Sequence, residues 1–224
     1  MNVLLSRAMG ILRKEGPLVL IRRGLKYVSQ SLFRYGTFYL CEHSIEQRDE
    51  DQFRPKVQSL TFRIVATNEQ ADDLTKDGLE DIRRSPVLVD VRKCLDNGAI
   101  AFCFFVGQEL AHIGWVALSE EAKSCFDILP YRVCFSEGQA CTGGSVTLPK
   151  YRGKGFMQYG YYKRFQFLQE KGYTTTRNAV DRSNMAARSA HRKFNPKVYG
   201  EARYLKVASW HLWKEYPLGE GASD

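Results

Sequence analysis

A basic, glycine-containing turn between a strand-like and a helix-like segment is the part of this 224-residue sequence best suited to chemistry. Residues 145–148 alternate in polarity as a strand does, Pro149 interrupts them, and the turn 151–155 follows. Apolar residues then recur at helical spacing until Gly172, which supplies a helix stop. Those that share one helical face are Met157, Tyr161, Phe165 and Leu168. The sequence therefore predicts a strand, a glycine turn and a helix in succession.

The chemistry that this turn offers is the binding of a phosphate or pyrophosphate group. Backbone N–H groups in the first turn of a helix have no partner within the helix, and the helix dipole places partial positive charge there. Gly153 and Gly155 let the backbone approach an anion closely, and Arg152 and Lys154 add full charges. The run lacks the G-x-x-x-x-G-K-[ST] spacing of a P-loop and the third glycine of a Rossmann fingerprint.

Two stretches of the chain resemble motifs of a known superfamily. Residues 150–155, K-Y-R-G-K-G, resemble the acyl-CoA pyrophosphate loop of the GNAT acetyltransferases, [Q/R]-x-x-G-x-[G/A], with Lys150 in place of Gln or Arg. Residues 184–195 resemble a second GNAT pattern, N-x-x-A-x-x-L-Y-x-K-x-G-F. The matching positions are Asn184, Ala187, Ala190, His191 and Lys193, followed by Asn195 where the family has Gly. The alternative is that the glycine turn only joins a strand to a helix.

The resemblance implies a site for acetyl-CoA, or another acyl-CoA, as co-substrate, without a metal. The pantetheine arm would pair with backbone groups of the central strand, and amides of the glycine turn and the helix start would hold the pyrophosphate. Asn184 would contact the pantetheine arm. The implied binding residues are Val146, Thr147, Leu148, Arg152, Gly153, Lys154, Gly155, Phe156, Met157 and Asn184.

Proton transfer also has candidates. His191 stands where many GNAT members have the Tyr that protonates the departing CoA thiolate, and an imidazole can donate a proton near neutral pH. Glu137, at the start of the central strand, is a candidate base that acts directly or through water; Asp181 and Tyr204 are further candidates. Each of these residues has a structural alternative, as a packing histidine or tyrosine or as a solvated carboxylate at a strand end.

The fold implied is of the α+β class (α/β three-layer): a GNAT-type mixed, mostly antiparallel twisted sheet flanked by helices, with an N-terminal basic amphipathic helical extension. The order of predicted elements agrees with that fold. Before the strand, glycine turn and helix described above come a strand at 60–65, a helical region from Asn68 to Leu95, a hairpin of 99–106 and 110–118, and an excursion at 119–138. After them come a strand at 174–180 and two last strands within 198–213 that turn near Glu201-Ala202.

The first part of the chain is predicted to extend the domain. Residues 1–57 are expected to form basic amphipathic helices and, from Thr37, a polar connector; residues 58–216 form the GNAT domain and 217–224 a tail. Residues 1–35 have seven basic side chains and one acidic, hence a charge of +6. Their apolar runs are too short to cross a bilayer, but such helices can lie on an anionic membrane surface or bind an acyl carrier protein. Packing on the domain itself and formation of a homodimer are the alternatives.

Composition narrows the classes of function. The net charge is +8, so the chain beyond residue 35 carries +8 minus +6, or +2, which disfavours a nucleic-acid partner. Six cysteines form no C-x-x-C pair and no metal-ligand spacing, a usage that indicates reduced, buried thiols. We therefore expect a cytoplasmic protein, peripheral at the inner face of the membrane if its N-terminus binds there.

The predicted function is acetyl transfer from acetyl-CoA to a primary amine. The acceptor expected first is a nucleotide-linked amino sugar, or another small-molecule amine, of cell-envelope or polysaccharide biosynthesis. One alternative is a longer-chain N-acyltransferase that uses acyl-CoA or an acyl carrier protein at the membrane surface. A second is a non-enzymatic basic binding module.

Overall fold

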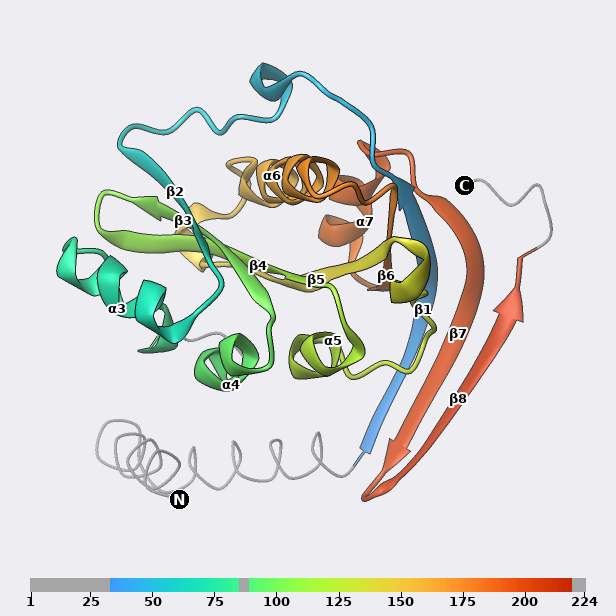
Figure 1. The fold of residues 1–224 in the computed structure, drawn as a ribbon. Helices are drawn as coiled ribbons and strands as arrows, with labels where there is room; N and C mark the ends of the chain where they lie inside the picture. The colour runs from blue at the N-terminus through green and yellow to red at the C-terminus, as the bar shows by residue number, and fades with distance from the viewer. Residues whose placement is uncertain (1–32, 85–88, 219–224) are drawn as a thin grey trace, which may run out of the picture.

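An open, twisted, eight-stranded sheet forms the centre of the protein (Figure 1). The computed structural model describes residues 33–84 and 89–218. Within them the strand order is β2-β3-β4-β5-β6-β1-β7-β8, and all neighbours are antiparallel except β5 and β6. The strands are β1 (Phe33–Ser44), β2 (Leu60–Val65), β3 (Ile100–Val106), β4 (Glu109–Ala117), β5 (Gln139–Thr147), β6 (Thr175–Asp181), β7 (Lys197–Val207) and β8 (Trp210–Pro217).

Helices cover both faces of this sheet, which confirms the predicted fold class. α6 (Phe156–Glu170) and α7 (Met185–Arg192) lie on one face (Figure 1). The other face carries α3 (Asn68–Lys76), α4 (Val91–Asp96) and α5 (Glu120–Phe126). No helix of the described residues is long and apolar enough to span a membrane.

The N-terminal strand β1 is the largest departure from the predicted organisation. It lies between β6 and β7 and pairs with both. The interpretation of the chain from Thr37 as a polar connector is wrong for residues 37–44, because Phe38 and Leu40 alternate with outward residues and are buried in the core. Residues 33–44 of the predicted extension thus belong to the sheet of the predicted domain. The amphipathic helices predicted within residues 1–35 lie outside the described residues up to 32, and the prediction is wrong for residues 33–35, which begin β1.

The chain between β2 and β5 differs from the prediction in two places. The helical region predicted from Asn68 to Leu95 is two separate helices, α3 and α4, each started by a capping side chain. The excursion predicted at 119–138 contains α5, where the Ser119 hydroxyl accepts a hydrogen bond from the Ala122 N–H at 3.2 Å. Ser119 is followed by two glutamates in the first turn, which is the usual signature of a helix start.

The last two strands turn later than predicted. β7 and β8 pair from Val207 with Trp210 to Gly200 with Pro217, so the turn lies at residues 208–209. Glu201 and Ala202, the predicted site of the turn, lie inside β7. Ala208 has a φ of 55°, a conformation that glycine or asparagine usually marks in a sequence, and neither residue is present there to signal the turn.

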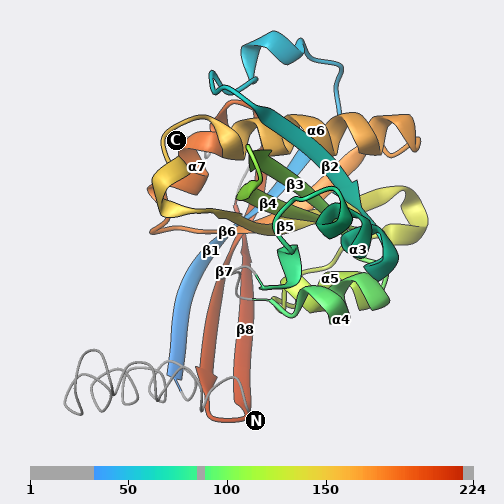
Figure 2. The ribbon, with the colours of Figure 1, turned by 90° about the vertical axis from the view of Figure 1, so that its left-hand side faces the viewer.

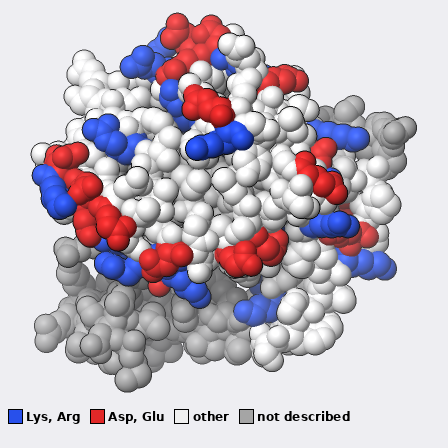
Figure 3. Space-filling view, in the orientation of Figure 1, with Lys and Arg blue, Asp and Glu red and all other residues white. Residues whose placement is uncertain are grey.

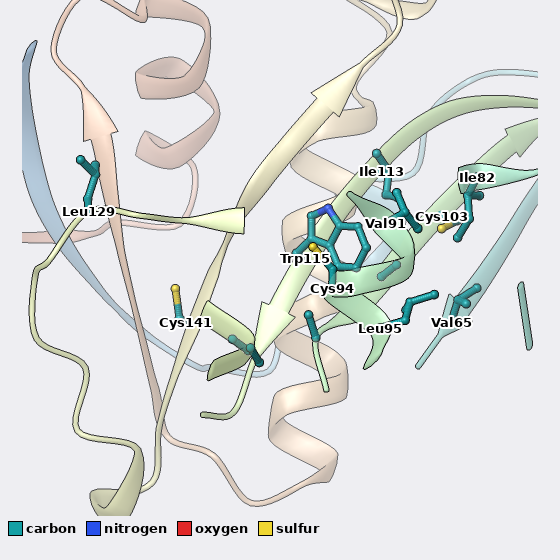
Figure 4. Packing of buried hydrophobic residues seen from close by; sticks show 14 of the residues in the cluster. Val65, Ile82, Val91, Cys94, Leu95, Cys103, Ile113, Trp115, Leu129 and Cys141 are labelled. Carbon is teal, nitrogen blue, oxygen red and sulfur yellow. The ribbon is translucent and has the colours of Figure 1, made fainter. Parts of the chain in front are cut away.

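Two apolar clusters, one on each face of the sheet, hold the layers together. Trp115 of β4 is fully buried, and its ring stacks on Phe126 of α5 with 6.2 Å between centroids. Figure 4 shows Trp115 near Cys94 and Ile113, which belong to the same apolar cluster. All six cysteines are free thiols; four are buried and two half-buried.

Candidate functional site

The glycine turn leads into α6 as predicted. α6 has 15 residues, and the residue before its first, Gly155, has a φ of 85°. Gly153 also lies in the left-handed region, with a φ of 74°. No side chain of the described chain caps the start of α6. Its first backbone N–H groups are therefore free to bind an anion, and the helix dipole favours negative charge there.

A pocket of about 440 Å³ opens beside this turn. The segment before β2 forms one wall, and the glycine turn with the first turn of α6 forms the other; the lining residues are 52–57, 153–155 and 158. Arg54, Lys56 and Lys154 bring three positive charges to it, and no Asp or Glu lines it. A volume of this size suits a small-molecule ligand. The pocket and the helix start together favour a ligand with several phosphate groups.

The basic residues of the turn have different environments. Lys150, which departs from the family motif, forms an ion pair with Glu109 at the start of β4, and the Tyr151 hydroxyl donates to the same carboxylate at 3.1 Å. Arg152 folds back on the strand, where its Nε donates to the Thr147 carbonyl at 3.3 Å. Lys154 is the basic side chain of the turn that lines the pocket.

The central strand β5 and its parallel neighbour β6 part midway. They pair only over Gln139–Cys141 with Thr175–Arg177, although β5 continues to Thr147 and β6 to Asp181. Beyond Cys141, the edge of β5 that faces β6 has no strand partner among the described residues. This unpaired edge ends at the glycine turn, and a ligand with amide groups could add to it as a strand does.

A bulge lies on the other side of β5, where it pairs with β4. The register shifts between Ile113 and Trp115, opposite Gly144, which has a φ of 56°. From α6, Arg164 reaches this bulge and donates to the Trp115 and Gly143 carbonyls at 3.5 and 3.4 Å. The fixed bulge gives β5 an irregular backbone at the point where it leaves β6.

Arg164 is fully buried, and no carboxylate is within salt-bridge distance of it in the described part of the chain. Its guanidinium lies 4.2 Å from the centre of the Tyr161 ring, and Nε donates to the Gly160 carbonyl at 2.9 Å. Nη2 has no partner among the described residues. Burial lowers the pKa of Arg164. Backbone carbonyls and an aromatic face, rather than an acid, stabilise this charge.

A chain of buried polar side chains lies between the sheet and the helices α6 and α7. His191 Nε2 is 2.7 Å from the Tyr161 hydroxyl, and His191 Nδ1 is 3.0 Å from His43 Nε2 on β1. Asn178 lies 3.5 Å from His43 Nε2 and donates to the Thr142 hydroxyl at 3.4 Å. This chain reaches β5 at Thr142, the first residue beyond its pairing with β6.

The buried histidines are held neutral. Burial is the main cause that lowers the pKa of His43 to about 4 and that of His112 to about 3, and the positive charge of Arg164 adds to both shifts. The pKa of His191 lies well below its usual value for the same main reason, with further contributions from His43 and Arg164. At neutral pH none of these rings is expected to carry a proton on both nitrogens.

The predicted catalytic residues are not brought together. His191 is 4% exposed, and both of its ring nitrogens already have partners. Glu137 is exposed at the paired end of β5, which is the end away from the glycine turn. Tyr204 is buried on β7, which β1 separates from β6, and its ring meets Trp213 edge to face. Their catalytic roles stay predictions.

The predicted binding residues, by contrast, lie along one line from β5 into α6. Val146, Thr147 and Leu148 end the unpaired edge, and residues 152–157 form the turn and the start of α6. Asn184 lies apart at the start of α7, where its side chain accepts a hydrogen bond from the Ala187 N–H at 3.0 Å. Asn184 is thus the N-cap of α7. Its contact with pantetheine stays a prediction.

Sequence reasoning does not identify Arg164 or His43 as part of this region. Arg164 carries a usable signal, because it is a charged residue among Tyr161, Phe165 and Leu168 on the apolar face of the helix. His43 carries none, since the polar residues around it give its strand the composition of a connector.

Comparison with solved structures gives the class of fold. A protein from Novosphingobium aromaticivorans assigned to the GNAT acetyltransferase family matches with a TM-score of 0.51 and 11% identity, over 78% of this chain and 64% of its own. A GCN5-related N-acetyltransferase from Kribbella flavida matches with a TM-score of 0.42 and 14% identity, over 84% of this chain and 65% of its own. This chain thus spans just under two thirds of their lengths. No protein-family model and no curated protein matches the sequence. The chain has the GNAT fold, as the two motifs predicted.

Proposed function

We propose that this protein is an acyl-CoA-dependent N-acetyltransferase that moves an acetyl group from acetyl-CoA directly to a primary amine. The observation that carries this proposal is the continuity of two binding features. The unpaired edge of β5 ends at a glycine turn, and the uncapped start of α6 follows it beside a basic pocket. Coenzyme A needs these features in that order, because its amide-containing pantetheine arm is joined to a pyrophosphate.

In the proposed reaction the protein mainly positions the reactants. The lone pair of the neutral amine attacks the thioester carbonyl carbon, and a backbone N–H of β5 near its bulge stabilises the oxyanion that forms. The carbon–sulfur bond then breaks, the amine nitrogen loses a proton to a base, and the CoA thiolate leaves and takes up a proton. Glu137 remains the proposed base; since its exposed carboxylate lies at the far end of β5 from the glycine turn, it would have to act through a chain of several water molecules.

For the proton that the thiolate receives, we propose that His191 acts together with Tyr161. The lowered pKa of His191 means that an imidazolium is not available at neutral pH. In the tautomer with its proton on Nε2, His191 would donate to the Tyr161 oxygen 2.7 Å away. That hydrogen bond would stabilise the phenolate left when Tyr161 gives up its proton. His191 is then a positioning residue rather than the acid.

The Tyr161 assignment predicts a kinetic difference between two variants. Tyr161→Phe removes the hydroxyl and is expected to lower kcat by roughly 100-fold with little change in the KM for acetyl-CoA. His191→Gln keeps a hydrogen-bonding side chain and is expected to lower kcat less and to move the alkaline limb of the pH–rate profile. If both variants keep kcat within about twofold of the original protein, Tyr161 does not supply the proton and His191 does not position it.

A short acyl group is favoured by the polar side chains at the point where β5 and β6 part. Thr142, Asn178 and Arg164 are buried there, and Asn178 Oδ1 and Arg164 Nη2 have no hydrogen-bond partner among the described residues. A long alkyl chain could not supply these atoms with the hydrogen bonds that buried polar groups require. We therefore propose acetyl-CoA as the donor. As the acceptor we propose the amine of a nucleotide-linked amino sugar of cell-envelope biosynthesis, which agrees with the basic N-terminal sequence.

The donor proposal is tested by thermal unfolding with CoA, acetyl-CoA, butyryl-CoA and palmitoyl-CoA. A ligand that binds only the folded state at 100 times its Kd adds about 2.7 kcal/mol, which corresponds to a rise in Tm of roughly 5–10 °C for a chain of this size. We expect the largest rise with acetyl-CoA. Thiol release from acetyl-CoA, measured with nucleotide-linked amino sugars, polyamines and peptide amines, then identifies the acceptor. The absence of any shift with all four CoA compounds would contradict the proposed function.

A further inference from the structure

Where β1 begins and β7 turns into β8, the sheet carries an apolar face that no helix of the described residues covers. Figure 2 shows these three strands extending past the helical layers. Large apolar side chains there are exposed to an unusual degree, including Tyr35 at 60% and Trp210 at 56%. We call this face the aromatic tip; its residues are Phe33, Tyr35, Leu205, Val207, Trp210 and Leu212.

The strand register places the aromatic tip on one side of the sheet. Phe33, Val207 and Trp210 are direct neighbours across the three strands and form the outermost row. Tyr35, Leu205 and Leu212 form the next row on the same face, because side chains two residues apart point the same way. The row between them, on the opposite face, is Arg34, Lys206 and His211.

Basic side chains border the aromatic tip, and acidic ones are absent from it. The third row on the same face brings Arg203 next to Lys214, about 7 Å further along the strands than the second row. Residues 33–41 and 202–214 contain no Asp or Glu. Elsewhere, on the face shown in Figure 3, acidic and basic side chains are mixed. The tip thus combines an apolar end with a purely basic border.

We propose that the aromatic tip binds the surface of an anionic lipid bilayer. A peripheral protein typically buries an apolar face some 5–10 Å into the interface, which matches two rows of side chains about 7 Å apart. Trp and Tyr prefer this depth, and Arg203 and Lys214 then lie at the level of the lipid phosphates. A second copy of the chain is a poorer occupant, since two acid-free basic borders would repel each other.

The proposal is tested by co-sedimentation of the full chain with large vesicles. We expect the protein to bind vesicles of phosphatidylcholine with about 30% phosphatidylglycerol and to bind pure phosphatidylcholine at least tenfold more weakly. The double variant Trp210→Ser, Leu212→Ser is expected to lose at least tenfold in partition coefficient on anionic vesicles. The matched control is Ile128→Ser, Met185→Ser, which removes two exposed apolar side chains outside the tip and is expected to bind as the original protein does.

Three results would overturn the proposal. The first is no binding of the original protein to anionic vesicles, and the second is equal binding by the tip variant. The third is a dimer in light scattering that the tip variant abolishes, which would make a second copy the occupant. Equal Tm values for the variants and the original protein establish that each is folded. Because the tip is remote from the glycine turn, failure here would leave acetyl-CoA binding unaffected, so the two proposals fail separately.

Discussion

Gly155→Glu is expected to lower the affinity for acetyl-CoA by two to three orders of magnitude. The side chain would start at the N-terminal end of α6, and a Cβ there meets only Gln158 Oε1, at 3.8 Å, so the carboxylate has room beside the free N–H groups. It would stand where the pyrophosphate is proposed to bind. Two unit charges about 4 Å apart near a protein surface repel by about 4 kcal/mol, which accounts for the expected loss.

Gly172→Glu is the matched control for that substitution. Gly172 follows the other end of α6 and has a φ of 81° against 85° at Gly155, and a Cβ added to it would have no described atom within 4 Å. Both variants therefore carry the same new charge and a similar backbone strain. Calorimetric titration with acetyl-CoA is expected to give unchanged affinity for Gly172→Glu. Equal affinities of the two variants for acetyl-CoA would contradict the assignment of the glycine turn as the pyrophosphate site.

Acidification is expected to remove much of the protein's stability between about pH 6.5 and 5. His43, His112 and His191 all have pKa values lowered by burial, so the unfolded chain binds protons near pH 6.5 that the folded chain does not. The free energy of unfolding then falls with pH by about 1.4 kcal/mol per unit for each ring, down to its folded-state pKa. From about pH 7 to 5 the loss is roughly 2 kcal/mol each for His43 and His112, and His191 adds a loss of the same sign.

Denaturant unfolding at several pH values measures this effect. Burial also raises the pKa of Asp127, which acts in the opposite direction in acid, so a difference between variants is a cleaner test than the total loss. His112→Leu is expected to reduce the slope between about pH 6 and 5 by about 1.4 kcal/mol per unit. His112 Nδ1 is hydrogen-bonded to the Thr147 hydroxyl at 2.8 Å. Thr147→Val breaks this hydrogen bond without removing a titrating group, so this variant should keep the original slope. Equal slopes in His112→Leu and the original protein would contradict a buried neutral ring.

The turn and the helix after it could be predicted because their signals are local. The positive φ angles at Gly153 and Gly155 and the apolar spacing of α6 are properties of a short run of sequence. β1 could not be placed in the same way. Its pairing with β6 joins residues more than a hundred positions apart, and the sequence of the strand itself does not indicate which strands it pairs with.

The polar interior of the site is hidden in the sequence for a related reason. His43, Tyr161 and His191 come from three separate elements, and only packing brings their rings within hydrogen-bonding distance. Close approach of α6 to β4 is also a tertiary property: a Cβ at Gly160 would lie 2.7 Å from His112 Nε2. The sequence therefore predicts the glycine turn as a pyrophosphate site, but not the buried hydrogen-bonded rings of the interior beside it.

The most direct test of the central claim is an amide-resolved NMR titration with acetyl-CoA. We predict that the largest shifts occur at the backbone N–H groups of residues 153–157, which form the end of the glycine turn and the start of α6, where no described side chain caps the helix. Smaller shifts are expected along the unpaired edge of β5. Saturable binding that leaves these amides unmoved, or no binding at all, would contradict the claim that the start of α6 holds the pyrophosphate of an acyl-CoA.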